Sequence, residues 1–296
     1  MNTPGQRLMT EARTLATRVR LKLALTRDTV RSKWPRLRFE ARNFLLNHRP
    51  VTAEVDGVRF RLLPRGAMVA DFWSGLRSVP NKVRFLLDVL QPGMTFLELG
   101  SNVGLFSIAA AKKLGASSVY AVEPRSWAFQ LLQENLRLNG LGNVAAFQVA
   151  IGNSAGEATL DETLPGDDGR SARGAEKIAM TTLDAFLETR GLKRVDVMKV
   201  DAEGAEFWVF RGGENLLLQP DAPLILYDSL AIRTKKFGYH PVEAMWLLQD
   251  CGYSLFGLDS ENGEISSRRV DSEYNGTVVA AKPGHPACSK LGLGTR

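Results

Sequence analysis

The sequence predicts an α/β fold in which a parallel, doubly wound sheet is covered by helices on both faces. Residues 96–111 read as an apolar strand, a turn bracketed by Gly100 and Gly104, and an alanine-rich helix. Strands and helices alternate after this segment up to residue 151. Such alternation implies parallel strands, and uninterrupted apolar strands suit a sheet that is covered on both faces. We expect a ligand where the glycine turn meets the helix N-terminus, at the carboxyl end of the sheet.

Residues 1–50 are set apart by their charge. They hold twelve Lys or Arg and three Asp or Glu, whereas the chain of 296 residues carries a net charge of only +6. The remainder is therefore slightly acidic, which argues against nucleic acid as a partner. Apolar residues at helical spacing indicate an amphipathic helix over residues 8–25, which either lies on an anionic membrane surface or packs on protein. A mitochondrial transit peptide has a similar composition.

The two cysteines, Cys251 and Cys288, lie far apart and outside any metal-binding spacing, so we expect free thiols in a reducing compartment. No segment approaches the roughly 20 apolar residues that span a membrane. The N-terminus lacks the apolar core of a secretory signal. We expect a cytoplasmic protein, and peripheral membrane contact through residues 1–50 stays open.

A hairpin precedes the sheet, because alternating strands flank Asp56-Gly57 over residues 51–63. A helix over residues 72–90 then leads into the first core strand. After the glycine turn we expect helices at 105–114 and 127–138, strands at 118–122, 144–151 and 157–160, and a polar loop at 161–177.

The second half continues the alternation and ends on an antiparallel pair. We expect strands at 178–183, 195–200, 224–227, 253–258 and 277–281, and helices at 184–190, 206–218 and 241–251. These elements define one domain over residues 51–282. Residues 1–50 form a basic helical extension, and residues 283–296 are expected to be a disordered tail.

The glycine turn lacks the close second glycine of a dinucleotide-binding loop, because Ser101 and Asn102 follow Gly100. Glu98 precedes the turn, where a carboxylate repels a pyrophosphate but suits an ammonium or a hydroxyl. The methionine end of S-adenosylmethionine offers an ammonium group. Glu123 ends the next strand, the usual place for an acid that holds ribose hydroxyls. The alternatives are a capping or ion-paired role for Glu98 and a solvated position for Glu123.

Five segments, in order along residues 72–260, resemble the FkbM family of class I S-adenosylmethionine-dependent methyltransferases. They are Phe96–Ser107, Ala121–Pro124, Ala150–Glu157, Thr182–Asp184 and Met198–Glu206. The resemblance implies a Rossmann-like sheet of seven strands with a reversed last hairpin. It also implies O-methylation, typically of sugar or polyketide hydroxyls. We expect the cofactor to be held by Glu98, Gly100, Ser101, Asn102, Gly104, Glu123, Pro124, Ala150, Ile151 and Asp201.

The chain departs from the family pattern at three positions. Glu98 stands where the family commonly has Asp, and Ser101 stands where Ala is usual. Asp228 follows the strand at 224–227, where the family usually has Glu. The basic extension lies outside the resemblance.

Charged residues gather where the strand at 195–200 ends. Lys199 and Asp201 share one strand face, and Glu203 and Glu206 open the next helix. Because this strand end lies beside the switch point of the sheet, we expect Asp201 to contact the cofactor or the acceptor hydroxyl, and Glu203 to act as general base. Lys199 would keep Asp201 ionised or orient the hydroxyl. A structural role at the helix N-terminus is the alternative for Glu206.

Asp228 and His240 are further candidates for the catalytic site, since both follow the strand at 224–227. A lone loop histidine is more often a surface residue. Asp201, Glu203 and Asp228 offer oxygen ligands of the kind that magnesium prefers, but we expect no metal.

The sequence therefore predicts a methyltransferase that uses S-adenosylmethionine and acts on a glycan, a glycolipid or another hydroxylated small molecule. An NAD-dependent oxidoreductase is the second enzyme class, and the missing middle glycine disfavours it. The third hypothesis is a binding protein that keeps the fold without catalysis. The presence of Glu98, Glu123, Asp201 and Glu203 argues against it.

Overall fold

The computed structural model describes residues 50–63, 80–161, 175–259, 264–271 and 273–290. Contacts divide the chain into two compact units, residues 1–51 with 63–77 and 164–168, and residues 52–62 with 78–163 and 169–296. Every helix and strand named below belongs to the second unit, apart from Val51 at its boundary. The predicted helix at 8–25, the first part of the helix at 72–90 and most of the loop at 161–177 lie outside the described residues.

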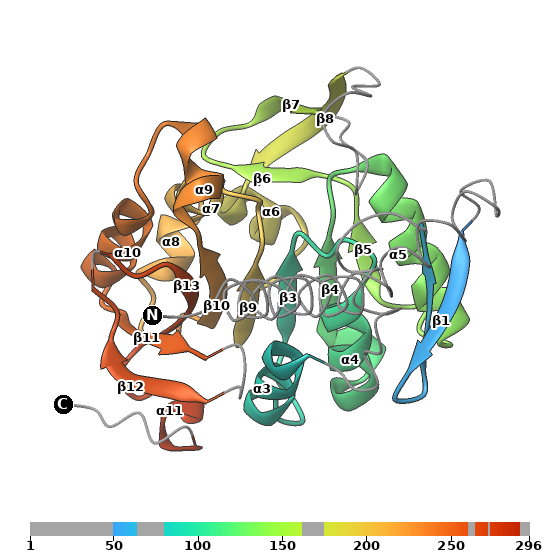
Figure 1. The fold of residues 1–296 in the computed structure, drawn as a ribbon, viewed down its shortest axis with the longest axis horizontal. Helices are drawn as coiled ribbons and strands as arrows, with labels where there is room; N and C mark the ends of the chain where they lie inside the picture. Colours follow the sequence, from blue (N-terminus) through green and yellow to red (C-terminus); the bar gives the residue numbers. More distant parts are fainter. Residues whose placement is uncertain (1–49, 64–79, 162–174, 260–263, 272, 291–296) are drawn as a thin grey trace, which may run out of the picture. The chain divides into compact units, whose positions relative to one another are not determined.

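The main sheet has the predicted doubly wound order (Figure 1). Its strands are β3 (Phe96–Leu99), β4 (Val119–Val122), β5 (Ala145–Phe147), β9 (Val197–Val200), β10 (Leu224–Ser229), β11 (Ser254–Leu258), β12 (Ile265–Arg269) and β13 (Gly276–Ala281). They lie in the order β12-β11-β13-β10-β9-β3-β4-β5. Strands β5, β4, β3, β9 and β10 run parallel, and β13 pairs antiparallel with both β10 and β11. The predicted seven strands and reversed last hairpin are confirmed.

Strand β12 is an eighth strand, which the sequence did not predict. It pairs antiparallel with β11 at the edge of the main sheet. Its residues are Ile-Ser-Ser-Arg-Arg, which carry little of the apolar character by which a core strand is found. An edge strand pairs on one side only and tolerates charged side chains, so its composition resembles that of a loop.

A second, small sheet lies over the ends of the central strands and has the order β6-β8-β7 (Figure 1). Its strands are β6 (Ala150–Gly152), β7 (Gly156–Asp161) and β8 (Ala175–Thr182). The single strand predicted at 144–151 is wrong, because the chain leaves the main sheet after Phe147 and enters the small sheet at Ala150. Within residues 144–151 only Gln148 interrupts the apolar run at this change of sheet, and a single polar residue does not distinguish two strands from one.

Helices connect the strands as a doubly wound fold requires. They are α3 (Asn81–Val89), α4 (Leu105–Leu114), α5 (Ser126–Leu138), α6 (Leu183–Thr189), α7 (Glu206–Arg211), α8 (Glu214–Leu217), α9 (Ala231–Thr234), α10 (Pro241–Asp250) and α11 (Pro286–Lys290). Two short 3-10 turns occupy Ala116–Ser118 and Lys235–Phe237. The helix predicted at 206–218 is interrupted by Gly212 and Gly213, which separate α7 from α8.

The predicted hairpin consists of β1 (Val51–Val55) and β2 (Val58–Leu62), which form a two-stranded sheet. Asp56 and Gly57 both have positive φ, 49° and 72°, as this two-residue turn requires. Asn135 of α5 and Asn139, which caps the C-terminus of that helix, hold β2 in place. Asn135 accepts from the backbone N–H of Arg61 at 2.5 Å and donates to its carbonyl at 3.1 Å, and Asn139 bonds Arg59 in the same way.

The C-terminal segment differs from the expected disordered tail. Helix α11 covers Pro286–Lys290, with Ala287 and Cys288 buried. His285 anchors it, since its Nε2 lies 3.0 Å from the carbonyl oxygen of Asp196. Cys251 and Cys288 are both free thiols. None of the helices in the described part of the chain is long and apolar enough to cross a membrane.

Candidate functional site

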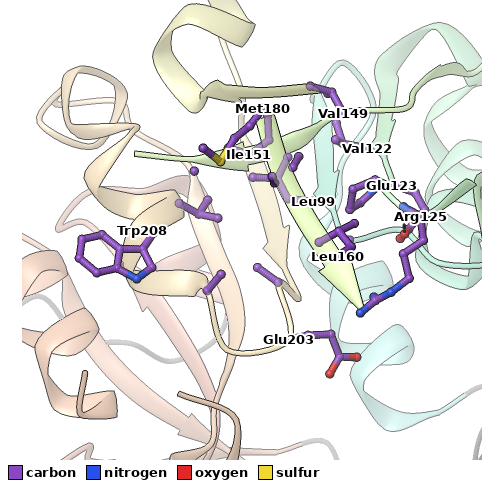
Figure 2. A pocket seen from close by; sticks show the side chains of 18 of the residues that line it. Leu99, Val122, Glu123, Arg125, Val149, Ile151, Leu160, Met180, Glu203 and Trp208 are labelled. Carbon is purple, nitrogen blue, oxygen red and sulfur yellow. Dashed lines mark hydrogen bonds between the residues drawn. The ribbon is translucent and has the colours of Figure 1, made fainter. Parts of the chain in front are cut away.

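A cavity of about 600 Å³ opens at the carboxyl ends of β3, β4 and β9, against the small sheet (Figure 2). Six of the ten predicted cofactor-binding residues line it: Gly100, Glu123, Pro124, Ala150, Ile151 and Asp201. In Figure 2, Glu123 and Arg125 lie at one end of the cavity and Trp208 lies at the other. The predicted Glu98, Ser101, Asn102 and Gly104 do not line it.

The turn after β3 is tied to both neighbouring strands. The backbone N–H groups of Gly100 and Ser101 donate to the carbonyl of Val122 at 2.8 and 2.9 Å. Gly100 has φ +84°, and a Cβ on it would lie 2.1 Å from the carbonyl oxygen of Asp201. The turn and the end of β9 therefore pack at a distance that only glycine permits.

Glu123 joins the end of β4 to the glycine turn. Its Oε2 accepts from the backbone N–H of Asn102 at 2.8 Å, and its Oε1 accepts from that of Arg125 at 2.9 Å. The side chain is buried, and burial raises its pKa although both hydrogen bonds oppose the rise. The predicted solvated alternative is wrong, because this acid lines the cavity from a buried position.

Glu98 does not point into the cavity. Its Oε2 accepts from the backbone N–H of Ser107 at 2.9 Å and from the Ser107 hydroxyl, and its Oε1 lies 3.4 Å from Nζ of Lys199. Burial raises the pKa of Glu98, and the nearby Lys199 ammonium only partly offsets that effect. The structure therefore gives Glu98 the capping and ion-paired position, because α4 and Lys199 supply the donors that a buried carboxylate needs.

Four charged groups form a chain at the cavity, and two of them, Asp201 and Glu203, line it. Lys199 Nζ lies 3.3 Å from Oδ2 of Asp201, and Arg233 reaches both Asp201 (3.1 Å) and Glu203 (3.5 Å). Burial alone would raise the pKa of Asp201, but the Lys199 ammonium and the Arg233 guanidinium outweigh it and leave the pKa lowered. Burial alone would lower the pKa of Lys199, but Asp201 and Glu98 outweigh it and leave the pKa raised. Both groups therefore stay charged at neutral pH.

The loop that carries Glu203 is held by Glu206 and Tyr239. Glu206 Oε1 accepts from the N–H groups of Ala202 and Gly204 at 2.9 and 3.1 Å, and the Tyr239 hydroxyl donates to the Gly204 carbonyl at 2.7 Å. Burial raises the pKa of Glu206. Glu203 has φ 53°, a sparsely populated conformation for a residue with a side chain. Glu206 therefore has the structural role at the start of a helix that the sequence analysis gives as the alternative to a catalytic one.

Asp228 and His240 lie apart from the main cavity. Asp228 Oδ1 accepts from Lys82 Nζ and from the Thr277 hydroxyl, each at 2.7 Å. His240 caps α10, with its Nδ1 accepting from the Val242 N–H at 3.4 Å, and it lines a separate hollow beside Trp246. The prediction that His240 joins the catalytic group is not supported by this position, since a helix cap already uses its ring nitrogen.

Among the described residues, no group of three His, Cys, Asp or Glu side chains could hold a metal ion. The three acids that were candidates for magnesium ligands, Asp201, Glu203 and Asp228, each form an ion pair with a basic side chain instead. Arg233 pairs with Asp201 and Glu203, whereas Lys82 pairs with Asp228.

Arg233 is a site residue that the sequence reasoning missed. It lies on α9, a helix of four residues with no periodic pattern. Its place after β10, on the carboxyl side of the sheet, was the available signal. Lys82 was missed as well, because it pairs with an acid 146 residues away.

Replacing Arg233 by glutamine is expected to reduce the free energy of unfolding by about 1 kcal/mol at neutral pH, a modest value because Arg233 is about one-third exposed. The lowered pKa of Asp201 means that its ion pairs stabilise the fold above the pKa of an unfolded aspartate, roughly 4. That contribution is lost as the pH falls through the lower folded value. Denaturant unfolding at pH 3 to 7 should therefore show a difference between wild type and Arg233→Gln that closes in acid.

The matched control for this prediction is Arg211→Gln. Arg211 at the end of α7 pairs with Glu214 at the start of α8, three residues further along the chain, and both side chains are well exposed. Its replacement should change stability by less than about 0.5 kcal/mol at every pH. Equal losses in both variants, or a loss at Arg233 that does not shrink as the pH falls, would contradict the role given to Asp201.

A family model described as the methyltransferase FkbM domain matches residues 98–255. Hexuronic acid methyltransferase AglP of Haloferax volcanii is 27% identical over 173 residues, which are 57% of this chain and 70% of that protein. Methyltransferase sdnD of Sordaria araneosa is 29% identical over 197 residues, covering 54% of this chain and 73% of that protein. The structure of M. jannaschii TYW2 in complex with AdoMet aligns with a TM-score of 0.39 and 16% identity, covering 78% of this chain and 84% of that chain.

Proposed function

Since the chain belongs to the FkbM family of S-adenosylmethionine-dependent methyltransferases, we propose that it transfers a methyl group to a hydroxyl of a glycan, a glycolipid or another small molecule. The observation that carries this proposal is the cavity at the carboxyl ends of β3, β4 and β9, bordered by Glu123 and Asp201. The hexuronic acid methyltransferase among the relatives supports a sugar-like acceptor.

The residues that line the cavity fit S-adenosylmethionine. A volume of about 600 Å³ lies within the usual range for small-molecule sites. Apolar side chains offer a surface for the adenine ring: Val122, Val149, Ile151, Leu160 and Met180. Glu123 lies at the end of the second core strand, where a carboxylate accepts hydrogen bonds from ribose hydroxyls. Asp201 is held ionised by its cationic neighbours, which suits the ammonium of the methionine end.

In the proposed reaction, Asp201 accepts a hydrogen bond from the acceptor hydroxyl and fixes its direction. The bound donor supplies the methyl group on a positively charged sulfur, so the protein's main task is to align the two reactants. As the acceptor oxygen bonds to the methyl carbon, the carbon–sulfur bond breaks. The hydroxyl proton passes to the carboxylate of Glu203, which Arg233 holds beside the ionised Asp201, and from there to water.

Lys199 is a positioning residue in this scheme. It keeps Asp201 ionised and also neutralises Glu98 beneath the glycine turn. Its ammonium lies 4.6 Å from the ring centroid of Phe106, which fixes the cation against the first turn of α4. Lys199 thereby connects the strand that carries Asp201 with the strand that leads into the glycine turn.

The proposal is tested with a donor that carries a labelled methyl group and with fractionated small molecules and polysaccharides as acceptors. Wild-type protein should label a carbohydrate fraction, and the label should survive mild alkali as a methyl ether does. Asp201→Asn should reduce labelling at least about tenfold, and Lys177→Met, an exposed change on β8, should not. Label found only on amines would contradict O-methylation.

A further inference from the structure

The small sheet forms one wall of the cavity that we assign to S-adenosylmethionine. Strand β6 contributes Ala150–Gly152, and the antiparallel pair β7–β8 contributes Ala158–Leu160 and Met180. The segment that follows β4, Glu123–Arg125, lines the same cavity (Figure 2). How tightly a ligand is enclosed therefore depends on how the small sheet is held against this segment.

One end of the small sheet is fixed by backbone packing. A Cβ on Gly212, at the end of α7, would lie 2.0 Å from the carbonyl oxygen of Gly152 at the end of β6. The Gly212 carbonyl also accepts from the backbone N–H of Asp184, just after β8, at 2.9 Å. Because these contacts are made by main-chain atoms, no rotation of a side chain can release them.

The opposite end of β8 is held by a side chain, that of Glu176. Its carboxylate accepts from the Ser126 hydroxyl and from the Ser126 backbone N–H, which lies 3.3 Å from each carboxylate oxygen. Ser126 is the first residue of α5, where N–H groups lack partners within the helix and the helix dipole favours a carboxylate. Of the side chains that the structure describes in β7 and over residues 175–179, Glu176 is the one that hydrogen-bonds to a segment outside the small sheet.

The neighbours of this contact lead to the cavity on both sides. Glu176 lies opposite Leu160 in the β7–β8 ladder, and Leu160 lines the cavity (Figure 2). Ser126 directly follows Arg125, whose backbone N–H donates to Oε1 of Glu123 at 2.9 Å. Glu176 itself does not line the cavity, so it acts on a bound ligand only through these neighbours.

Gln148 brings a third segment to the same contact. It lies where the chain passes from β5 to β6, and its Nε2 donates to the Ser126 hydroxyl at 2.6 Å and to the Pro124 carbonyl at 3.4 Å. The Ser126 hydroxyl therefore accepts from Gln148 while it donates to Glu176. Three segments that carry residues of the cavity meet at this one hydroxyl.

We propose that Glu176 is a positioning residue for the cofactor. Its contact with Ser126 holds the β7–β8 pair in place, and the cofactor enters and leaves when this contact opens. The packing of Gly152 against Gly212 is the fixed end about which the small sheet moves. The inference goes beyond the proposed function, since it assigns no acceptor and rests only on S-adenosylmethionine occupying this cavity.

This role has a kinetic signature that a purely structural role lacks. Since Glu176 does not line the cavity, its contact with Ser126 stabilises the closed wall equally before and after the cofactor binds. Loss of the contact should therefore speed entry and exit by the same factor and leave the dissociation constant nearly unchanged. A residue that only shapes the wall would instead raise the dissociation rate alone and weaken the affinity.

The experiment follows labelled S-adenosylmethionine on the full chain, with association measured by rapid mixing and dissociation by a chase of unlabelled S-adenosylhomocysteine. Glu176→Ala should raise both rates about tenfold, as expected for the loss of one or two hydrogen bonds. Glu176→Gln keeps an oxygen that accepts from Ser126, so both rates should return to within about threefold of wild type. Glu157→Ala is the matched control, because Glu157 is an exposed acid of β7 that pairs with Lys177 inside the small sheet, and both rates should stay within about twofold.

Ser126→Ala tests the same contact from its other side, because it removes the hydroxyl and keeps the backbone N–H. It should also raise both rates, and the double variant should exceed Glu176→Ala by less than about twofold, since the two changes remove one shared contact. Thermal unfolding confirms that each variant is folded at the assay temperature.

The outcomes separate this inference from the proposed function. Unchanged rates in Glu176→Ala, equal changes in Glu157→Ala, multiplied effects in the double variant, or faster dissociation with weaker affinity would overturn the inference alone. Failure of labelled S-adenosylmethionine to bind the wild-type chain would overturn the inference and the proposed function together.

Discussion

Substituting Gly100 with alanine is expected to lower the free energy of unfolding by about 2–5 kcal/mol and to abolish cofactor binding. The added Cβ would lie 2.1 Å from the backbone carbonyl oxygen of Asp201, so the clash cannot be relieved by a side-chain rotation. The positive φ of +84° adds about 1–2 kcal/mol for a residue with a side chain, and overpacking commonly costs about 1–3 kcal/mol. Thermal unfolding and calorimetry with S-adenosylhomocysteine measure the two effects.

Gly57→Ala is the matched control, because it separates backbone strain from the clash. Gly57 has φ +72°, and a Cβ on it would meet nothing within 4 Å. Its replacement should cost about 1 kcal/mol and leave cofactor binding unchanged. Equal destabilisation in both variants, or retained binding in Gly100→Ala, would mean that the close approach of the turn to Asp201 does not matter for the site.

Glu123→Gln is expected to weaken binding of S-adenosylhomocysteine by about 10- to 100-fold, equivalent to about 1.4–2.7 kcal/mol. The amide of glutamine would direct a donor toward the N–H of Asn102 or Arg125, where the carboxylate now accepts. It would also remove the charge that strengthens hydrogen bonds to ribose hydroxyls. Calorimetric titration of both proteins gives the ratio directly.

Glu203→Gln is the comparison for this prediction, since Glu203 also lines the cavity but lies at the loop beyond β9. We expect its affinity for S-adenosylhomocysteine to stay within about threefold of wild type, while methyl transfer falls. Equal losses of affinity in the two variants would contradict the separate roles assigned to the two acids.

The sequence predicts those parts of the fold that depend on a few adjacent residues. Asp56-Gly57 carries the signature of its turn, and Gly100 with Gly104 marks the exit from the first core strand. Glu123 lines the cavity, as expected of an acid at the end of the second core strand of a doubly wound sheet. In each case a few adjacent residues determine the backbone conformation.

The parts that escaped prediction depend on contacts between distant segments. Residues 144–151 have the pattern of one strand, since a single polar residue, Gln148, is the only interruption between the main sheet and the small one. The sequence predicts that Glu98 faces the ligand, whereas the structure pairs it with Lys199. This partner lies about a hundred residues away in sequence and comes beside Glu98 only through the pairing of β3 with β9, so no local pattern indicates it. Arg233 completes the charge chain from a four-residue helix. Long-range pairing of this kind leaves no local signature.

Calorimetric titration of the full chain with S-adenosylhomocysteine and with NAD tests the central claim most directly. We expect saturable binding of the adenosyl ligand with one site per chain, and no binding of NAD, because the glycine turn lacks the close second glycine that a pyrophosphate requires. Binding of NAD in preference to S-adenosylhomocysteine, or no binding of S-adenosylhomocysteine to folded protein, would contradict the cofactor site assigned to this cavity.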